Sequence, residues 1–211
     1  PDDLFDRGMA AFQGGDYPGA AEAFDRYVGR EPGDPAGWYN LGTAYHRAGR
    51  PGYGVWAWLR ALRLDPRDAD ARHNLQVAGA PPELVSRATP VLPLRSSEMV
   101  LLGTLAWLLA GGAGAFWLLR RRRAMGITAV SALGAALVLA AAWWTSTQGT
   151  DTVIVLESTT LRAGPALQAE AVTALDPGTG LVQVERFGDW VRARSLRGEE
   201  GWIEENATGR L

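Results

Sequence analysis

Side chains that could act as catalysts or metal ligands are few and scattered in this 211-residue chain. There are two histidines, His46 and His73, and no cysteine. A metal site built on both histidines would also need a carboxylate within reach. Adjacent carboxylates occur at Glu199-Glu200 and Glu204-Glu205, but in a polar loop and near the end of the sequence, where we expect them to be solvated.

Catalysis requires acids, bases or nucleophiles that are held in position. The sequence contains no phosphate-binding loop, no Gly-x-Ser-x-Gly elbow and no His-Glu-x-x-His motif. The formal net charge of -2 also argues against nucleic-acid binding. The sequence therefore predicts a protein that is not an enzyme and that holds no metal or cofactor.

The strongest concentration of charge is a run of four arginines, Arg120, Arg121, Arg122 and Arg123, between two uncharged segments. Met99–Leu119 and Ala124–Thr150 contain no ionisable side chain. About 20 apolar residues cross a bilayer core of roughly 30 Å as a helix. We therefore predict two transmembrane helices over residues 98–147. The positive-inside rule places the arginines in the cytoplasm and both flanks outside it, in an inner-membrane protein.

The first predicted span contains a tryptophan, Trp107, in the middle of its length. Tryptophan prefers the headgroup level at either end of a span, so we expect Trp107 to pack against the second helix or a partner. Small residues at intervals of four, among them Gly103 and Ala136, favour close packing of the two helices.

The front of the chain repeats itself with a period of 34 residues. The pairs that share this spacing are Leu4 and Trp38, Gly8 and Gly42, Phe24 and Trp58, and Pro32 and Pro66. A fixed period of this length is typical of stacked helical repeats. The second copy, with Trp38, Leu41-Gly42, Tyr45, Ala61 and Pro66, resembles a tetratricopeptide repeat. Residues 1–79 are thus predicted to form an all-α module of two repeats plus a capping helix.

Prolines place the helices of the second repeat. Helices are expected at about Pro35–Ala48 and Pro51–Leu64, each with proline near its start, where the missing N–H costs nothing. Pro66 should move Asp65 out of helical geometry, and Gly42 should let the paired helices approach closely. Two repeats make a small core, so we expect support from the membrane, the other module or a partner.

The resemblance to tetratricopeptide repeats implies a concave face that binds a peptide or protein. Seven residues of the first helices of each pair would form it: Phe5, Met9, Phe12, Tyr39, Thr43, His46 and His73. Phe5 and Met9 depart from the residues with which some members hold a C-terminal carboxylate, so this ligand is not expected. The alternative is that several of these side chains, Phe12 and Tyr39 above all, are packed between helices.

A proline-containing linker is predicted at residues 80–97, mostly irregular, with a helical turn within Pro81–Arg87. Beyond the hairpin, residues 151–211 change to short strands separated by turns, which predicts a small all-β barrel. The expected strands are Val153–Leu156, Thr160–Arg162, Ala171–Leu175, Leu181–Arg186, Trp190–Arg194 and Gly201–Ile203.

The rear module resembles bacterial Src-homology-3-like domains. The resemblance rests on Thr160–Pro165, Leu175–Thr179, Gly188–Arg194 and Gly201–Ile203. All five tyrosines lie in the front module, so a tyrosine-lined groove for polyproline is not expected. Phe187 and Trp190 could form a ligand platform. The alternative is that Trp190 and Trp202 cover the barrel core.

The order of the modules, repeats, membrane hairpin and Src-homology-3-like domain, resembles the BatE-type proteins of aerotolerance operons. This resemblance implies a non-enzymatic scaffold in a bacterial envelope complex of the MoxR/Bat type, with BatA-, BatB- and BatD-like partners. A second hypothesis is a cell-wall anchor, in which the barrel holds peptidoglycan and the repeats recruit an enzyme.

Overall fold

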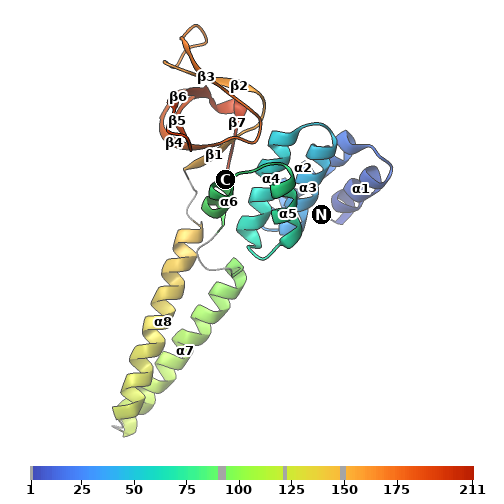
Figure 1. Ribbon diagram of the computed structural model, residues 1–211. Coiled ribbons are helices and arrows are strands. Elements are labelled where there is room, and N and C mark those ends of the chain that lie inside the picture. Colours follow the sequence, from blue (N-terminus) through green and yellow to red (C-terminus); the bar gives the residue numbers. More distant parts are fainter. Residues whose placement is uncertain (1, 90–93, 121–122, 148–150) are drawn as a thin grey trace. The chain divides into compact units, whose positions relative to one another are not determined.

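The computed structural model describes residues 2–89, 94–120, 123–147 and 151–211; several further side chains within the helices, those of residues 117–120 and 123–129 among them, lie outside the description. The chain divides into two compact units. One comprises Pro1–Thr89 and Gly149–Leu211, and the other Pro90–Gln148. In Figure 1 the first unit contains a stack of helices and a curled sheet, and the second a pair of long helices.

The repeat domain, residues 2–88, is an array of antiparallel helices (Figure 1). Its helices are α1 (Asp2–Gln13), α2 (Tyr17–Arg30), α3 (Pro35–Arg47), α4 (Pro51–Leu64), α5 (Ala69–Val77) and α6 (Pro82–Ala88). Asp34 and Asp68, 34 residues apart, cap α3 and α5 by accepting backbone N–H groups. Asp65 adopts extended geometry beside Pro66, as predicted.

The 34-residue period has a steric cause. A Cβ on Gly8 would lie 2.6 Å from the Phe24 ring, and one on Gly42 would lie 2.6 Å from the Trp58 ring. In each repeat, therefore, a glycine on the first helix accepts the large ring of the second helix. The prediction that Gly42 permits close helix approach is confirmed.

The β-domain, residues 151–211, is one antiparallel sheet of seven strands curled on itself (Figure 1). The strands are β1 (Thr152–Val155), β2 (Thr159–Arg162), β3 (Ala171–Leu175), β4 (Gly180–Phe187), β5 (Trp190–Ser195), β6 (Glu200–Glu204) and β7 (Thr208–Arg210). Their order is β3-β2-β6-β5-β4-β1-β7. The six predicted strands are present; β7 and the short 3-10 helix before it were not predicted.

Strand β1 is buried on both of its faces. Val153 and Val155 enter the core of the β-domain, whereas Ile154 between them belongs to the core of the repeat domain. Successive strand residues point to opposite faces, so one strand can serve two cores. Leu211 also belongs to the repeat core.

The linker is more ordered than the sequence indicated. Residues Pro82–Ala88 form the two-turn helix α6, and Leu84 is fully buried in the repeat core. The helical turn predicted within Pro81–Arg87 is thus present and extends to Ala88, whereas its burial in the repeat core was not predicted. The adjacent apolar residues Leu84 and Val85 of α6 were the sequence feature that indicated packing against a core, despite the neighbouring prolines.

The second unit consists of helices α7 (Ser96–Arg120) and α8 (Arg123–Thr147), which pack along one another. The side chains of Arg120, Arg121, Arg122 and Arg123 lie outside the described residues. Within the described part of the chain, no helix is both long enough and apolar enough to span a membrane.

Candidate protein-binding surfaces

The predicted binding residues of α1 are packed rather than free. Phe5 meets Phe24 and Tyr27 edge to face, with ring centroids 5.6 and 5.2 Å apart. Phe12 meets Tyr17 in the same way at 5.2 Å, and Met9 packs against the repeat core. These side chains therefore join α1 to α2, and large substitutions there would disturb folding as well as any binding.

The predicted residues of α3 form a connected polar cluster. The Thr43 hydroxyl donates to the Tyr39 carbonyl at 2.9 Å and accepts from the Trp58 Nε1–H at 3.3 Å. The Tyr39 hydroxyl in turn accepts from the Asn74 amide of α5 at 3.4 Å. Tyr39 and Thr43 are thus held in fixed positions between neighbouring helices.

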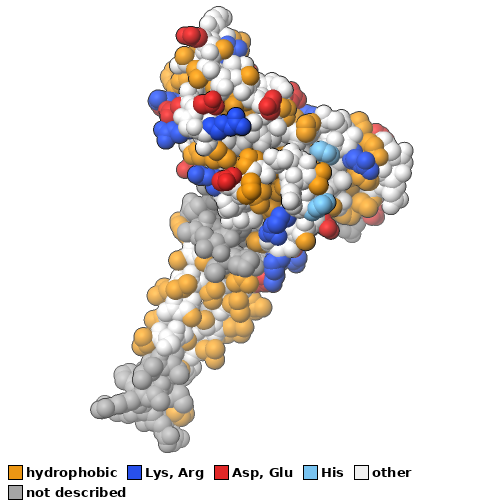
Figure 2. Space-filling view, in the orientation of Figure 1, with side chains coloured by type: hydrophobic (Ala, Val, Ile, Leu, Met, Phe, Trp, Pro, Cys, Tyr) orange, Lys and Arg blue, Asp and Glu red, His pale blue; other side chains and the backbone are white. Residues whose placement is uncertain are grey.

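His46 and His73 are exposed, and Figure 2 shows histidine side chains at the surface of the repeat domain. The His46 ring lies against the Trp58 ring, with centroids 5.3 Å apart. Among the residues that the structure describes, no three His, Cys, Asp or Glu side chains gather where they could hold a metal ion. Both histidines lie at the surface of the repeat domain, and one of them, His46, packs on Trp58.

Sequence reasoning missed two residues that hold this surface in place, the buried Trp58 beneath it and Asn74 within it. Trp58 was recognised as the large repeat residue, but its Nε1–H on Thr43 depends on how the helices pack. Asn74 lies 34 residues after Asn40, a match visible in the sequence. We call Tyr39, Thr43, His46, His73 and Asn74 the α3–α5 surface.

On the β-domain, aromatic side chains lie on the outer face of the sheet. Val191 and Ile203 point into the core, so Trp190 and Trp202, which alternate with them, face outward and are partly exposed. Phe187 is 65% exposed and meets Trp202 edge to face with centroids 6.5 Å apart. Trp190 and Trp202 are not among the described residues that pack against the β-domain core, so the placement does not support the interpretation of them as core cover. The ligand platform of Phe187 and Trp190 stays a prediction, and Trp202 lies beside Phe187 on the same face.

Ion pairs border these rings. Two nitrogens of the Arg194 guanidinium, Nε and Nη2, donate to one Glu200 oxygen at 2.9 and 2.7 Å, and Arg192 Nε lies 2.8 Å from the other oxygen. The hydrogen bonds from Arg194 hold the pKa of the Glu200 carboxyl below its usual value. Glu200 thus stays ionised and fixes the two arginines beside Trp202.

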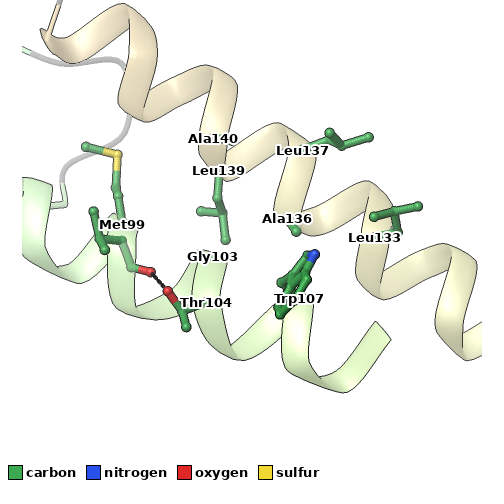
Figure 3. A pocket seen from close by; sticks show the side chains of 10 residues that line it. Met99, Gly103, Thr104, Trp107, Leu133, Ala136, Leu137, Leu139 and Ala140 are labelled. Atoms are coloured by element: carbon green, nitrogen blue, oxygen red, sulfur yellow. Dashed lines mark hydrogen bonds between the residues drawn. The ribbon is translucent and has the colours of Figure 1, made fainter. Parts of the chain in front are cut away.

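The second unit has a groove of about 500 Å³ between its helices (Figure 3). In Figure 3 the Trp107 ring extends from α7 toward α8 near Ala136, while Leu133 and Leu137 line the α8 side. Trp107 nevertheless remains 64% exposed. Its ring therefore rests over the small residues of α8 without being enclosed by them.

Comparison with known families identifies both modules of the first unit. Residues 5–69 match the family model described as tetratricopeptide repeat, and residues 157–208 match the one described as bacterial SH3 domain. The chain combines these two domains. No curated protein matches the sequence. Both families are typically non-catalytic interaction domains, which indicates protein partners for the repeat domain and suggests cell-wall binding for the SH3 domain.

Proposed function

We propose that this protein is a membrane-anchored, non-enzymatic scaffold that assembles envelope proteins into a bacterial complex of the MoxR/Bat type. The observation that carries the proposal is that two interaction domains flank, in the chain, a pair of 25-residue helices with many exposed apolar side chains. Two binding modules on one anchor allow partners to be held near each other, which raises their effective concentration.

Support for anchoring comes from the side chains of the helix pair. On α7 and α8 the exposed large apolar residues are Val100, Leu101, Leu102, Leu105, Trp107, Leu108, Leu109, Phe116, Val130, Leu133, Leu137, Val138 and Trp144. Soluble monomers rarely expose apolar surface of this extent, and lipid would cover it. We place the protein in the inner membrane with two spans, the arginine loop in the cytoplasm and both interaction domains on the other side.

The α3–α5 surface is the proposed contact for a partner. It combines exposed His46 and His73 with hydrogen-bonding side chains that are already fixed by their neighbours. A pre-ordered surface loses less side-chain entropy on binding. BatA-, BatB- and BatD-like membrane proteins are the proposed partners.

Site-specific cross-linking tests this scaffold role. A photoreactive amino acid at position 73, in cells of the source organism, should give a defined adduct with another envelope protein. The same probe at Glu22, an exposed residue of α2, is the matched control and should give none. Identical adducts from both positions, or none from position 73, would contradict the proposed contact.

A cell-wall anchor is the second candidate, favoured by the bacterial SH3 match and the exposed rings of Phe187 and Trp202. The β-domain has 10 acidic residues against 6 arginines, so binding to an anionic polymer would depend on stacking rather than charge. Full-length protein in detergent should then sediment with purified sacculi, and Phe187→Ala should weaken this. Leu167→Ala, at another exposed apolar residue, should not. Without saturable sedimentation this candidate fails.

A further inference from the structure

The outer face of helix α4 is covered by the chain's own β-domain. Gly52 of α4 lies directly against the backbone carbonyl of Leu156, which leaves no space for a side chain. The Trp56 ring lies on Gly209 of β7, where a Cβ would be 2.6 Å from the ring. Glycines on both sides therefore mark the points where the two domains approach most closely.

Polar contacts fix strand β7 at this face. The Arg210 carbonyl accepts two hydrogen bonds, from Trp56 Nε1 at 2.8 Å and from Arg60 Nε at 3.1 Å. The Arg60 guanidinium also lies over the Trp38 and Trp56 rings. Strand β7 is one edge of the sheet, and an open edge is prone to pair with other chains. Here side chains of α4 bond the Arg210 carbonyl and cover Gly209 on that edge strand.

Two further contacts extend the interface on either side. The Arg50 guanidinium lies 3.7 Å from the Tyr53 ring centroid and 3.4 Å from the Glu157 carboxylate of the β-domain. On α6, Leu84 fills the space above Gly180, where a Cβ would lie 2.5 Å from it. Apolar, hydrogen-bonded and cationic contacts thus all join the same two domains.

We infer that the β-domain is the closing element of the repeat stack, in the place that a further repeat would take. Stacked repeats usually need at least three copies, because each covers the apolar face of the next. Here two copies suffice because Ile154 and Leu211 of the β-domain, together with Leu75 of α5 and Leu84 of α6, complete their core. Each domain therefore stabilises the other, and the face of α4 that carries Gly52, Trp56 and Arg60 is occupied by the β-domain, so an outside partner would bind elsewhere, for example at the α3–α5 surface.

Hydrogen exchange of the full chain in detergent, read by mass spectrometry, tests this dependence in both directions. Gly209→Leu forces a side chain into the Trp56 ring and should speed exchange in α4 and α5 about tenfold. Trp56→Ala should do the same in β1 and β7. The controls are Gly164→Ala and Gly29→Ala, where the added Cβ meets only ordinary contact or open space; neither should affect the other domain.

Changes confined to the domain that carries the substitution would overturn the inference. The test remains decisive even if Gly209→Leu unfolds the β-domain altogether, because α4 and α5 should then lose their protection from exchange as well. A repeat domain that kept its protection beside an unfolded β-domain would show that it needs no closing element.

Discussion

Replacing Gly42 by alanine tests the steric basis of the repeat. The new Cβ would lie 2.6 and 2.8 Å from two atoms of the Trp58 ring and 3.0 Å from the Gly54 carbonyl oxygen. Trp58 is 2% exposed, hydrogen-bonded to Thr43 and in contact with His46, so its ring cannot move aside cheaply. Overpacking of this kind costs about 1–3 kcal/mol.

Alanine also favours a helix over glycine by about 0.5–1 kcal/mol, which acts in the opposite direction. Gly29→Ala on α2 isolates that gain, because nothing lies within 4 Å of its Cβ position. The free energy of unfolding of Gly42→Ala should therefore fall below that of Gly29→Ala by about 1–3 kcal/mol. Urea denaturation followed by circular dichroism at 222 nm measures both.

A double-mutant cycle attributes the loss to the ring. In a Trp58→Ala background the clash with the ring is gone and only the 3.0 Å approach to the Gly54 carbonyl oxygen remains, so Gly42→Ala should cost less than in the wild type. If Gly42→Ala were as stable as Gly29→Ala, or if its cost were unchanged once the Trp58 ring had been removed, the steric reasoning would be refuted.

Three more changes have expected outcomes. Burial, with Asp25 nearby, raises the pKa of Tyr45 to about 12. The neutral phenol therefore contributes about 2–3 kcal/mol to the free energy of unfolding, which is complete below pH 10 and is lost as the pH rises toward 12. Between pH 10 and 12 the free energy of unfolding of Tyr45→Phe, measured by urea titration, should therefore fall less than that of the wild type. A wild-type profile no steeper than that of the variant would contradict this. The lowered pKa of Glu200 stabilises the fold at pH values above the pKa of this group in the unfolded chain, and the stabilisation is lost as the pH falls. Glu200→Gln should therefore flatten the acid dependence of hydrogen exchange in β5 and β6. An unchanged dependence would exclude a stabilising role for the Glu200 ion pairs. Leu84→Ala should lower the free energy of unfolding by about 2–5 kcal/mol and expose α6 to proteases, whereas wild-type resistance would mean that α6 is not part of the core.

The repeat helices and strands could be predicted because their signals are local. Pro35 and Pro51 mark helix starts, and the alternation of Val191 and Ala193 with larger outward residues marks β5. Strand β7 carries no such signal: Thr208–Arg210 is short, polar and contains glycine, and it is a strand because it pairs with β1.

The binding residues were harder to predict than the helices that carry them. Periodicity gives the helix but not which side of it meets a neighbour, so Phe5 and His46 looked equivalent in the sequence. In the structure Phe5 lies between α1 and α2, while His46 is exposed. The contact of Trp56 with Gly209 joins residues 153 positions apart and has no sequence signal.

The most direct test of the membrane-anchored scaffold is cysteine labelling in intact cells. The chain has no cysteine, so His73→Cys and Leu167→Cys, both at exposed positions, each supply a single thiol. After removal of any outer barrier, a membrane-impermeant maleimide should label both positions without lysis, on protein that remains in the membrane fraction after a carbonate wash. Labelling of only one position, labelling of either only after lysis, or release by carbonate would contradict the account.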